Sequence, residues 1–292
     1  MPELPEVETI RLSLLPVLAG RMIGKIEILT PEVWLGEIPE PGIWRIDGLT
    51  RRGKYLMINL QAGVKSGGCL LVHLRMTGQL LLQTDDLPPV KHDHIRLRLD
   101  QPSATGRPNQ DPVWLVYHDT RRFGRIWMLP DRSAGQPAGL AGLGPEPLEP
   151  GFDGCVLSAR LALRPRASLK AALLDQTVVA GLGNIYADEA LFAGRLNPSR
   201  PAGSLSPEEA GRLSGAIIRV LNQAVLCQGT TLRDYVNGWN RKGTFQDCLM
   251  VYGRSGQPCR HCGSLVRSLR LAGRTTCWCP SCQPEISQTG VT

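Results

Sequence analysis

Four cysteines near the C-terminal end have the spacing of a metal site. They are Cys259, Cys262, Cys279 and Cys282. Two residues separate the members of each pair, so one tight turn can aim two thiolates at one ion, and two such turns complete the tetrahedral shell of Zn²⁺. We therefore predict one structural zinc ion. Cys277 breaks the spacing, and His261 is not needed because four thiolates fill the shell. The segment between the pairs can form a hairpin with Arg274 at its tip.

The N-terminal stretch MPELPEVETI places two prolines and two glutamates ahead of an apolar stripe. One interpretation is a helix start, because Pro5 suits the first helical turn and apolar residues recur at helical spacing. We predict this helix from Pro5 to about Leu15, with Pro16 and Gly20 marking its end. A second interpretation is that the terminus carries out chemistry, since Glu3 and Glu6 are groups that can transfer or hold protons.

The stretch VVAGLGNIYADEALF predicts a glycine-rich turn followed by a helix. Asn184 is placed to cap this helix, and Gly181 and Gly183 permit positive φ and close backbone approach. Asp188 and Glu189 complement the helix dipole. N–H groups at such a helix start attract phosphate. An ordinary capped helix pair has the same pattern, so the phosphate role gains weight only beside a basic zinc ribbon.

These candidate residues need elements to position them. Apolar or alternating runs predict strands over residues 22–29, 54–60, 69–82, 94–100, 113–117 and 125–129. A series of short strands separated by turns is typical of a β-sandwich or barrel. Residues 133–154 are dense in Gly and Pro and predict an interdomain connection. Beyond them the pattern becomes helical, over residues 167–174, 185–193 and 207–226.

Composition and charge limit which classes of protein and which binding partners fit this sequence. The 292 residues suggest about two domains of ~150 residues, with 42% hydrophobic and 20% charged residues as in globular proteins. No run approaches the ~18–20 apolar residues of a membrane span, and no secretion signal is present, so we expect a cytoplasmic protein. Residues 156–292 carry 16 Lys and Arg against 8 Asp and Glu, which favours a nucleic-acid partner.

Taken together, the motifs resemble the bacterial formamidopyrimidine-DNA glycosylases, base-excision repair enzymes that remove oxidised purines such as 8-oxoguanine and formamidopyrimidines. The resemblance rests on PELPEVET, RRGKYL, HLRMTG, DTRRFG, the glycine-rich turn and the cysteine ribbon. It implies an α+β multidomain fold: an N-terminal β-sandwich with flanking helices, then a helix–two-turn–helix domain with a C-terminal zinc ribbon. The expected parts are a sandwich (1–132), a linker (133–154), a helical DNA-binding domain (155–250), a zinc ribbon (251–284) and a mobile tail (285–292).

The resemblance also implies a catalytic route. Removal of Met1 frees the amine of Pro2, which attacks the deoxyribose C1′, expels the base and leaves an iminium ion. That cation promotes β,δ-elimination at both phosphates. A free α-amine has a pKa of about 7.7–8.0, so a useful fraction is neutral at pH 7. Glu3 would be the general acid/base, Glu6 a supporting carboxylate, and Lys54 a contact to the phosphate and damaged nucleotide.

Six further residues match DNA-binding positions of the family. Met76, Arg121 and Phe123 would fill the gap left when the damaged nucleotide flips out of the stack. His73, Asn184 and Arg274 would bind phosphates that flank the lesion. Two positions depart from the family pattern, since Thr120 replaces a common proline and Arg75 a common glycine. We expect a monomer that binds double-stranded DNA carrying oxidised purines.

Two other interpretations stay open from the sequence. One is a sibling enzyme of the endonuclease VIII type, which shares the chemistry but prefers oxidised pyrimidines. That group tends to lack PELPEVET and DTRRFG. The other is a non-catalytic DNA-binding protein, whose zinc ribbon and helical turn bind damaged or bent DNA.

Overall fold

The computed structural model describes residues 1–40, 42–63, 65–101, 113–131 and 135–285. The chain divides into two compact units. The first comprises Met1–Ala141 with Cys227–Gln246, and the second Gly142–Leu226 with Asp247–Thr292. The structure thus groups a segment of the C-terminal half with the N-terminal unit, whereas the predicted domains place it among the helices. The predicted tail lies outside the described residues beyond Glu285.

The first unit begins with α1 (Leu4–Leu18), which packs on β3 (Trp44–Arg52) and β4 (Tyr55–Ala62). The predicted end at about Leu15 is three residues too early, because α1 continues through Pro16 to Leu18, two residues before Gly20. Proline removes only one N–H from the helix ladder. The last turn is held by the full burial of Leu18 and by the hydrogen bond from the Ala19 N–H to the carbonyl of Leu15.

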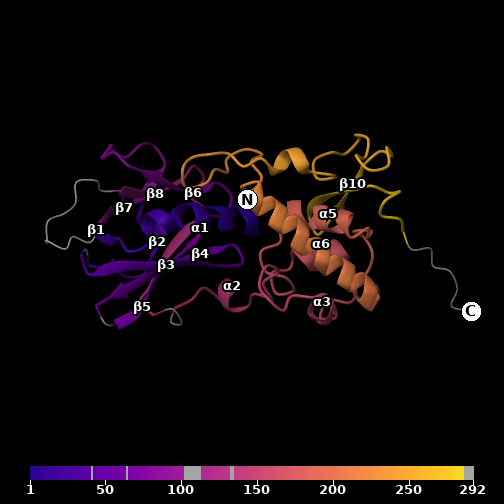
Figure 1. The fold of residues 1–292 in the computed structure, drawn as a ribbon, viewed down its shortest axis with the longest axis horizontal. Helices are drawn as coiled ribbons and strands as arrows, with labels where there is room; N and C mark the ends of the chain where they lie inside the picture. Colours follow the sequence, from indigo (N-terminus) through magenta and orange to yellow (C-terminus); the bar gives the residue numbers. More distant parts are fainter. Residues whose placement is uncertain (41, 64, 102–112, 132–134, 286–292) are drawn as a thin grey trace, which may run out of the picture. The chain divides into compact units, whose positions relative to one another are not determined.

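Within the described residues, nine strands form one hydrogen-bonded sheet in the order β2-β9-β5-β4-β3-β1-β7-β8-β6. They are the indigo to magenta strands of Figure 1. Besides β3 and β4 they are β1 (Met22–Ile28), β2 (Trp34–Leu35), β5 (Lys65–His73), β6 (Gly78–Gln83), β7 (Asp93–Asp100), β8 (Val113–Asp119) and β9 (Arg125–Leu129). All neighbours are antiparallel except β2 and β9.

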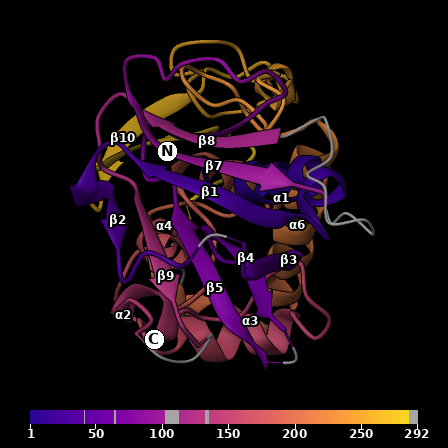
Figure 2. The same ribbon diagram turned by 90° about the vertical axis from the view of Figure 1, so that its left-hand side faces the viewer.

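The sheet turns a corner at β1. This strand pairs with β3 only at Met22↔Arg45 but with β7 along most of its length. The strands β9-β5-β4-β3 therefore form one layer and β1-β7-β8-β6 another, and the two sets cross in Figure 2. Ile58 and Leu70 of the first layer and Leu97 and Leu115 of the second line one small apolar space. This arrangement confirms the predicted sandwich.

The strand predicted over residues 69–82 is two strands separated by a turn. β5 ends at His73 and β6 starts at Gly78, and the N–H of Gly78 closes the turn on the carbonyl of Leu74 at 3.1 Å. Gly78 has no room for a side chain, because a Cβ would lie 2.5 Å from that carbonyl oxygen and 2.6 Å from the Tyr117 hydroxyl. The prediction of a single strand is wrong because Leu74 and Met76 continue the apolar alternation of the strands through the turn.

The second unit holds the remaining long helices and a two-stranded sheet. Its elements are α3 (Gly154–Leu161), α4 (Leu169–Leu174), α5 (Asn184–Ala193), α6 (Pro207–Leu226), β10 (Arg267–Leu271) and β11 (Arg274–Trp278). α6 packs on α3 and α5, and α5 on β11. α6 spans the predicted residues, whereas α3 begins inside the predicted linker. Asp153 caps α3 by accepting the N–H of Val156 at 2.9 Å. No helix within the described ranges is long and apolar enough to cross a membrane.

Candidate functional site

The start of α1 is a buried polar cluster. Pro2 is buried, and Glu3 and Glu6 are only 3% and 2% exposed, whereas Met1 is exposed. Glu3 is the N-cap, and its N–H donates to Oε2 of Glu6 at 2.8 Å. Pro5 lies in the first turn, where its missing N–H costs nothing. The helix start therefore holds the residue after Pro2 in a fixed position.

The second oxygen of the Glu6 carboxylate binds a segment far along the chain. Oε1 accepts the N–H of Thr230, 224 residues away, at 2.7 Å. The buried Tyr235 hydroxyl donates to the carbonyl of Gln228 at 3.1 Å, and burial together with the Glu6 carboxylate raises the pKa of Tyr235. Glu6 thus links the N-terminal residues to Cys227–Gln246. No local sequence pattern signals this contact.

Lys54 lies in a two-residue hairpin loop between β3 and β4. The pair Arg52↔Tyr55 closes the loop, and Gly53 has a φ of 56°. Glycine in the first loop position with positive φ is a favoured hairpin geometry. Lys54 is only 7% exposed. The next residue, Tyr55, pairs across β4 and β5 with His73, and their rings meet edge to face at 4.5 Å. The hairpin therefore brings two predicted phosphate contacts into one neighbourhood.

His73 is a neutral hydrogen-bond donor in this arrangement. Burial, with the Arg75 and Lys54 cations, lowers the pKa of His73 to about 3. Its Nδ1 accepts the N–H of Arg75 at 3.1 Å, so the ring proton resides on Nε2. Arg75 has a φ of 55°, in the left-handed region that glycine adopts most readily. Glycine, the residue that the sequence resemblance leads us to expect here, would adopt this conformation without strain.

Three residues predicted to fill a DNA gap lie together on two loops. Met76 is 43% exposed and Phe123 48% exposed. Nη1 of Arg121 lies 3.3 Å from Sδ of Met76, and its Cζ lies 4.6 Å from the centroid of the Phe123 ring. The guanidinium therefore sits between a thioether and an aromatic face. We call these three side chains the apolar-cationic triad.

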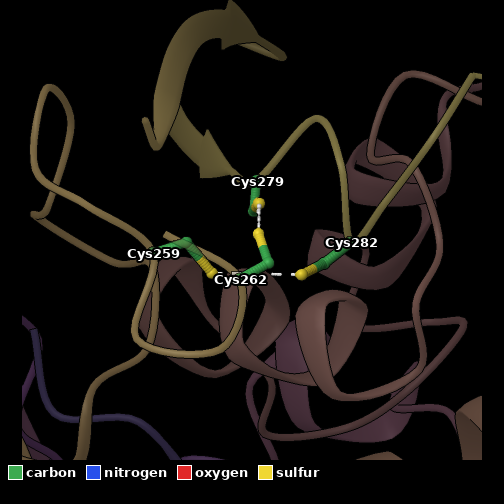
Figure 3. Close-up of side chains that lie close together, drawn as sticks. All are labelled: Cys259, Cys262, Cys279 and Cys282. Carbon is green, nitrogen blue, oxygen red and sulfur yellow. Dashed lines mark hydrogen bonds between the residues drawn. The ribbon is translucent and has the colours of Figure 1, made fainter. Parts of the chain in front are cut away.

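The four predicted zinc ligands converge in the second unit (Figure 3). All four sulfur atoms lie within 4.8 Å of one another. Sγ of Cys259 is 3.9 Å from that of Cys282, and Cys262 is 3.4 Å from Cys279. A tetrahedral Zn²⁺ with Zn–S bonds of about 2.3 Å separates its sulfurs by about 3.8 Å, so the cluster fits the ion. Cys277 is buried outside this cluster, as predicted.

Asn184 contacts the residue next to Arg274 where α5 approaches the ribbon. The prediction that Asn184 caps α5 is wrong, because Gly183 is the N-cap. Nδ2 of Asn184 instead donates to the carbonyl of Thr275 at 3.0 Å. The predicted hairpin is confirmed, since Leu271 pairs with Arg274 across its tip and Arg274 is exposed. The first turn of α5 is thereby tied to the strand that carries this arginine.

Two carboxylates on α5 fix the ribbon to the helix, and this replaces their predicted dipole role. Oδ1 of Asp188 lies 2.6 Å from Nζ of the fully buried Lys170, and Oδ2 accepts the N–H of Cys277 at 3.0 Å. Burial raises the pKa of Asp188 to about 6, and the Lys170 cation opposes this rise. Glu189 accepts three successive N–H groups, from Met250, Val251 and Tyr252, at 2.8–2.9 Å.

Comparison with known proteins identifies the same family along the whole chain. Residues 1–126 match the formamidopyrimidine-DNA glycosylase N-terminal domain. Residues 143–236 match the formamidopyrimidine-DNA glycosylase H2TH domain, and residues 256–284 match the zinc finger found in FPG and IleRS. The three matches follow one another in the order that the sequence motifs predict.

Individual relatives are similar over nearly their full length. Formamidopyrimidine-DNA glycosylase of Symbiobacterium thermophilum is 45% identical, covering 97% of this chain and 90% of that protein. The enzyme of Moorella thermoacetica is 46% identical, covering 92% and 95%. The crystal structure of MutM (Fpg) from Thermus thermophilus is 40% identical with a TM-score of 0.80, covering 97% and 99%. Lactococcus lactis Fpg bound to DNA containing an abasic site is 34% identical with a TM-score of 0.83, covering 97% and 100%.

Proposed function

Because the chain belongs to the formamidopyrimidine-DNA glycosylase family, we propose that Pro2, once Met1 is removed, is the nucleophile with which it excises oxidised purines from double-stranded DNA. The protein is a bacterial DNA-repair glycosylase with AP lyase activity and one structural Zn²⁺. One observation carries the proposal: Pro2 and Glu3, directly after the exposed Met1, are buried, and Glu3 is held by its hydrogen bond to Glu6, whereas residues near a terminus without a role are usually frayed.

The proposed chemistry follows from a secondary amine beside a carboxyl group. The nitrogen lone pair of Pro2 attacks C1′, the bond to the base breaks with its electron pair leaving on the base, and the departing base takes up the proton that the Pro2 nitrogen loses. Glu3 protonates the ring oxygen O4′, the C1′–O4′ bond opens, and an iminium ion forms. Loss of a proton from C2′ then expels the 3′ phosphate, and a second elimination expels the 5′ phosphate.

Glu6 acts in this proposal as a positioning residue. Its carboxylate accepts one N–H from Glu3 and one from Thr230, so both oxygens are engaged in holding backbone rather than in moving protons. A group that fixes the neighbour of the nucleophile reduces the motion that misaligns the attack on C1′.

Each unit supplies its own candidate residues for phosphate binding. Lys54 supplies a cation and His73 a neutral Nε2–H donor in the first unit. Arg274 supplies an exposed cation and Asn184 an amide in the second. Charged contacts to phosphate provide affinity and register without sequence information. The apolar-cationic triad would occupy the gap in the stack.

We predict that 8-oxoguanine opposite cytosine is excised faster than thymine glycol, because the family of this chain is defined by formamidopyrimidine lesions. A relative from Lactococcus lactis, 33% identical, has been solved with DNA containing an oxidised pyrimidine, so weak excision of thymine glycol is also expected. Single-turnover rates on matched duplexes measure the ratio. Faster release of thymine glycol would instead support the endonuclease VIII type of enzyme.

We also propose that the protein works in the bacterial cytoplasm on nucleoid DNA. The support is the substrate itself, since oxidised purines that require excision from duplex DNA lie in the chromosome.

A further inference from the structure

The carboxylate of Asp119 lies beneath both loops that carry the apolar-cationic triad. Asp119 is the last residue of β8 and is fully buried. Met76 belongs to the turn between β5 and β6, and the other two members belong to the turn between β8 and β9. Two turns separated by more than forty residues must keep a fixed distance for their side chains to stack.

Each oxygen of Asp119 accepts two hydrogen bonds, and three of these four bonds come from the two turns. Oδ1 accepts the Thr77 hydroxyl at 2.5 Å and the N–H of Arg121 at 3.1 Å. Oδ2 accepts the N–H of Gly124 at 2.9 Å and the Tyr117 hydroxyl at 3.1 Å. Thr77 directly follows Met76, and the N–H groups of Arg121 and Gly124 flank Phe123. One carboxylate therefore sets the positions of all three triad side chains.

The packing around these bonds leaves little freedom. A Cβ on Gly124 would lie 1.8 Å from the Tyr117 hydroxyl, and one on Gly78 would lie 2.6 Å from it. Each glycine ends one of the two turns, and the tyrosine hydroxyl occupies the space that a side chain would need at both positions. Burial raises the pKa of Asp119, but the hydrogen bonds from Thr77, Gly124 and Arg121 lower it below the usual range, which keeps the carboxylate charged.

We propose that Asp119 is the positioning residue that holds the two loops in register, so that the triad enters the base stack as one unit when the lesion flips out. This inference rests on the proposed role of the triad. Asp119 does not touch the reacting atoms, and its effect is confined to substrates that must be flipped. A preformed abasic site has no base to unstack, so its cleavage depends much less on the triad.

The chain offers a conservative pair of variants for the test. Thr77→Val keeps the shape of the side chain but removes the hydroxyl donor, whereas Thr77→Ser keeps the donor. Asp119→Asn is the more severe change. An amide NH₂ replaces one carboxylate oxygen, so a donor group meets the two donors whose hydrogen bonds that oxygen accepted. Asp93→Asn is the matched control, since Asp93 is a buried carboxylate of the same unit that binds His118 and the N–H of Val90 and neither loop.

The measurement is the ratio of two single-turnover rates, excision of 8-oxoguanine from duplex DNA and strand cleavage at a preformed abasic site. We expect Thr77→Val and Asp119→Asn to lower the first rate by about tenfold to a hundredfold and the second by less than about threefold. Thr77→Ser and Asp93→Asn leave the ratio unchanged. Equal losses of rate on both substrates, or no loss on either, would overturn the inference. If Asp119→Asn fails to fold, the comparison of Thr77→Val with Thr77→Ser provides the test. Failure of the proposed function is distinguishable, because wild-type protein would then not cleave the abasic site.

Discussion

Glu3→Gln is expected to reduce excision of 8-oxoguanine by roughly 10²–10⁴-fold, the usual contribution of a positioned general acid or base. Glutamine has the same shape but cannot deliver a proton to O4′. The backbone N–H of Glu3, which binds Glu6, is retained, so the helix start persists. Single-turnover rates on an 8-oxoguanine duplex measure the loss, and binding to a duplex with an uncleavable abasic analogue should change little.

The matched control for this variant is Glu8→Gln. Glu8 belongs to the same helix, but its carboxylate pairs with Arg11 at 2.6 Å and Arg51 at 3.0 Å outside the buried terminal cluster. Its replacement should leave the excision rate close to that of the wild type. If Glu3→Gln excised the lesion within about threefold of the wild-type rate, Glu3 would not be the proton-transfer group.

Loss of zinc is expected to abolish DNA binding by the ribbon of the second unit. Structural zinc contributes an apparent ~10–16 kcal/mol to small cysteine sites, so Cys279→Ser should unfold the ribbon. Arg274 and the contact from Asn184 to Thr275 depend on that hairpin. We expect affinity for lesion DNA to fall by about tenfold to a hundredfold, as for one or two charge-assisted contacts. Metal content and the dissociation constant are measured on the same preparations.

Cys277→Ala provides the control for this experiment. Cys277 is buried in β11, two positions before Cys279, but its sulfur is outside the four-sulfur cluster. The variant should keep one zinc ion per chain and wild-type affinity. If a zinc-free Cys279→Ser protein bound lesion DNA with wild-type affinity, the ribbon would not contribute to DNA binding.

Local patterns predicted the parts of the site that depend on spacing. The cysteine pairs predicted the zinc cluster because two residues between ligands fix a turn whatever surrounds it. The alternating strands predicted a sandwich, and the helix of residues 207–226 was recovered with its ends. These features are local, so neighbouring residues determine them.

What could not be predicted depends on contacts between distant residues. Glu6 and Thr230 are 224 positions apart, and no pattern near either residue indicates their hydrogen bond. Asp188 and Glu189 look like solvated helix charges, yet they are buried because Lys170 and backbone N–H groups compensate them. Buried carboxylates of this kind are recognised only when their partners are placed.

The measurement that tests the account most directly is borohydride trapping with DNA containing 8-oxoguanine. Protein that begins at Pro2, verified by intact mass, should form a covalent adduct, because borohydride reduces the iminium ion to a stable amine. Protein with one extra residue before Pro2 has an amide at that nitrogen and should form none. Peptide mapping should place the adduct on Pro2. An adduct of equal yield in the extended protein, or one mapped to Lys54, would contradict the central claim.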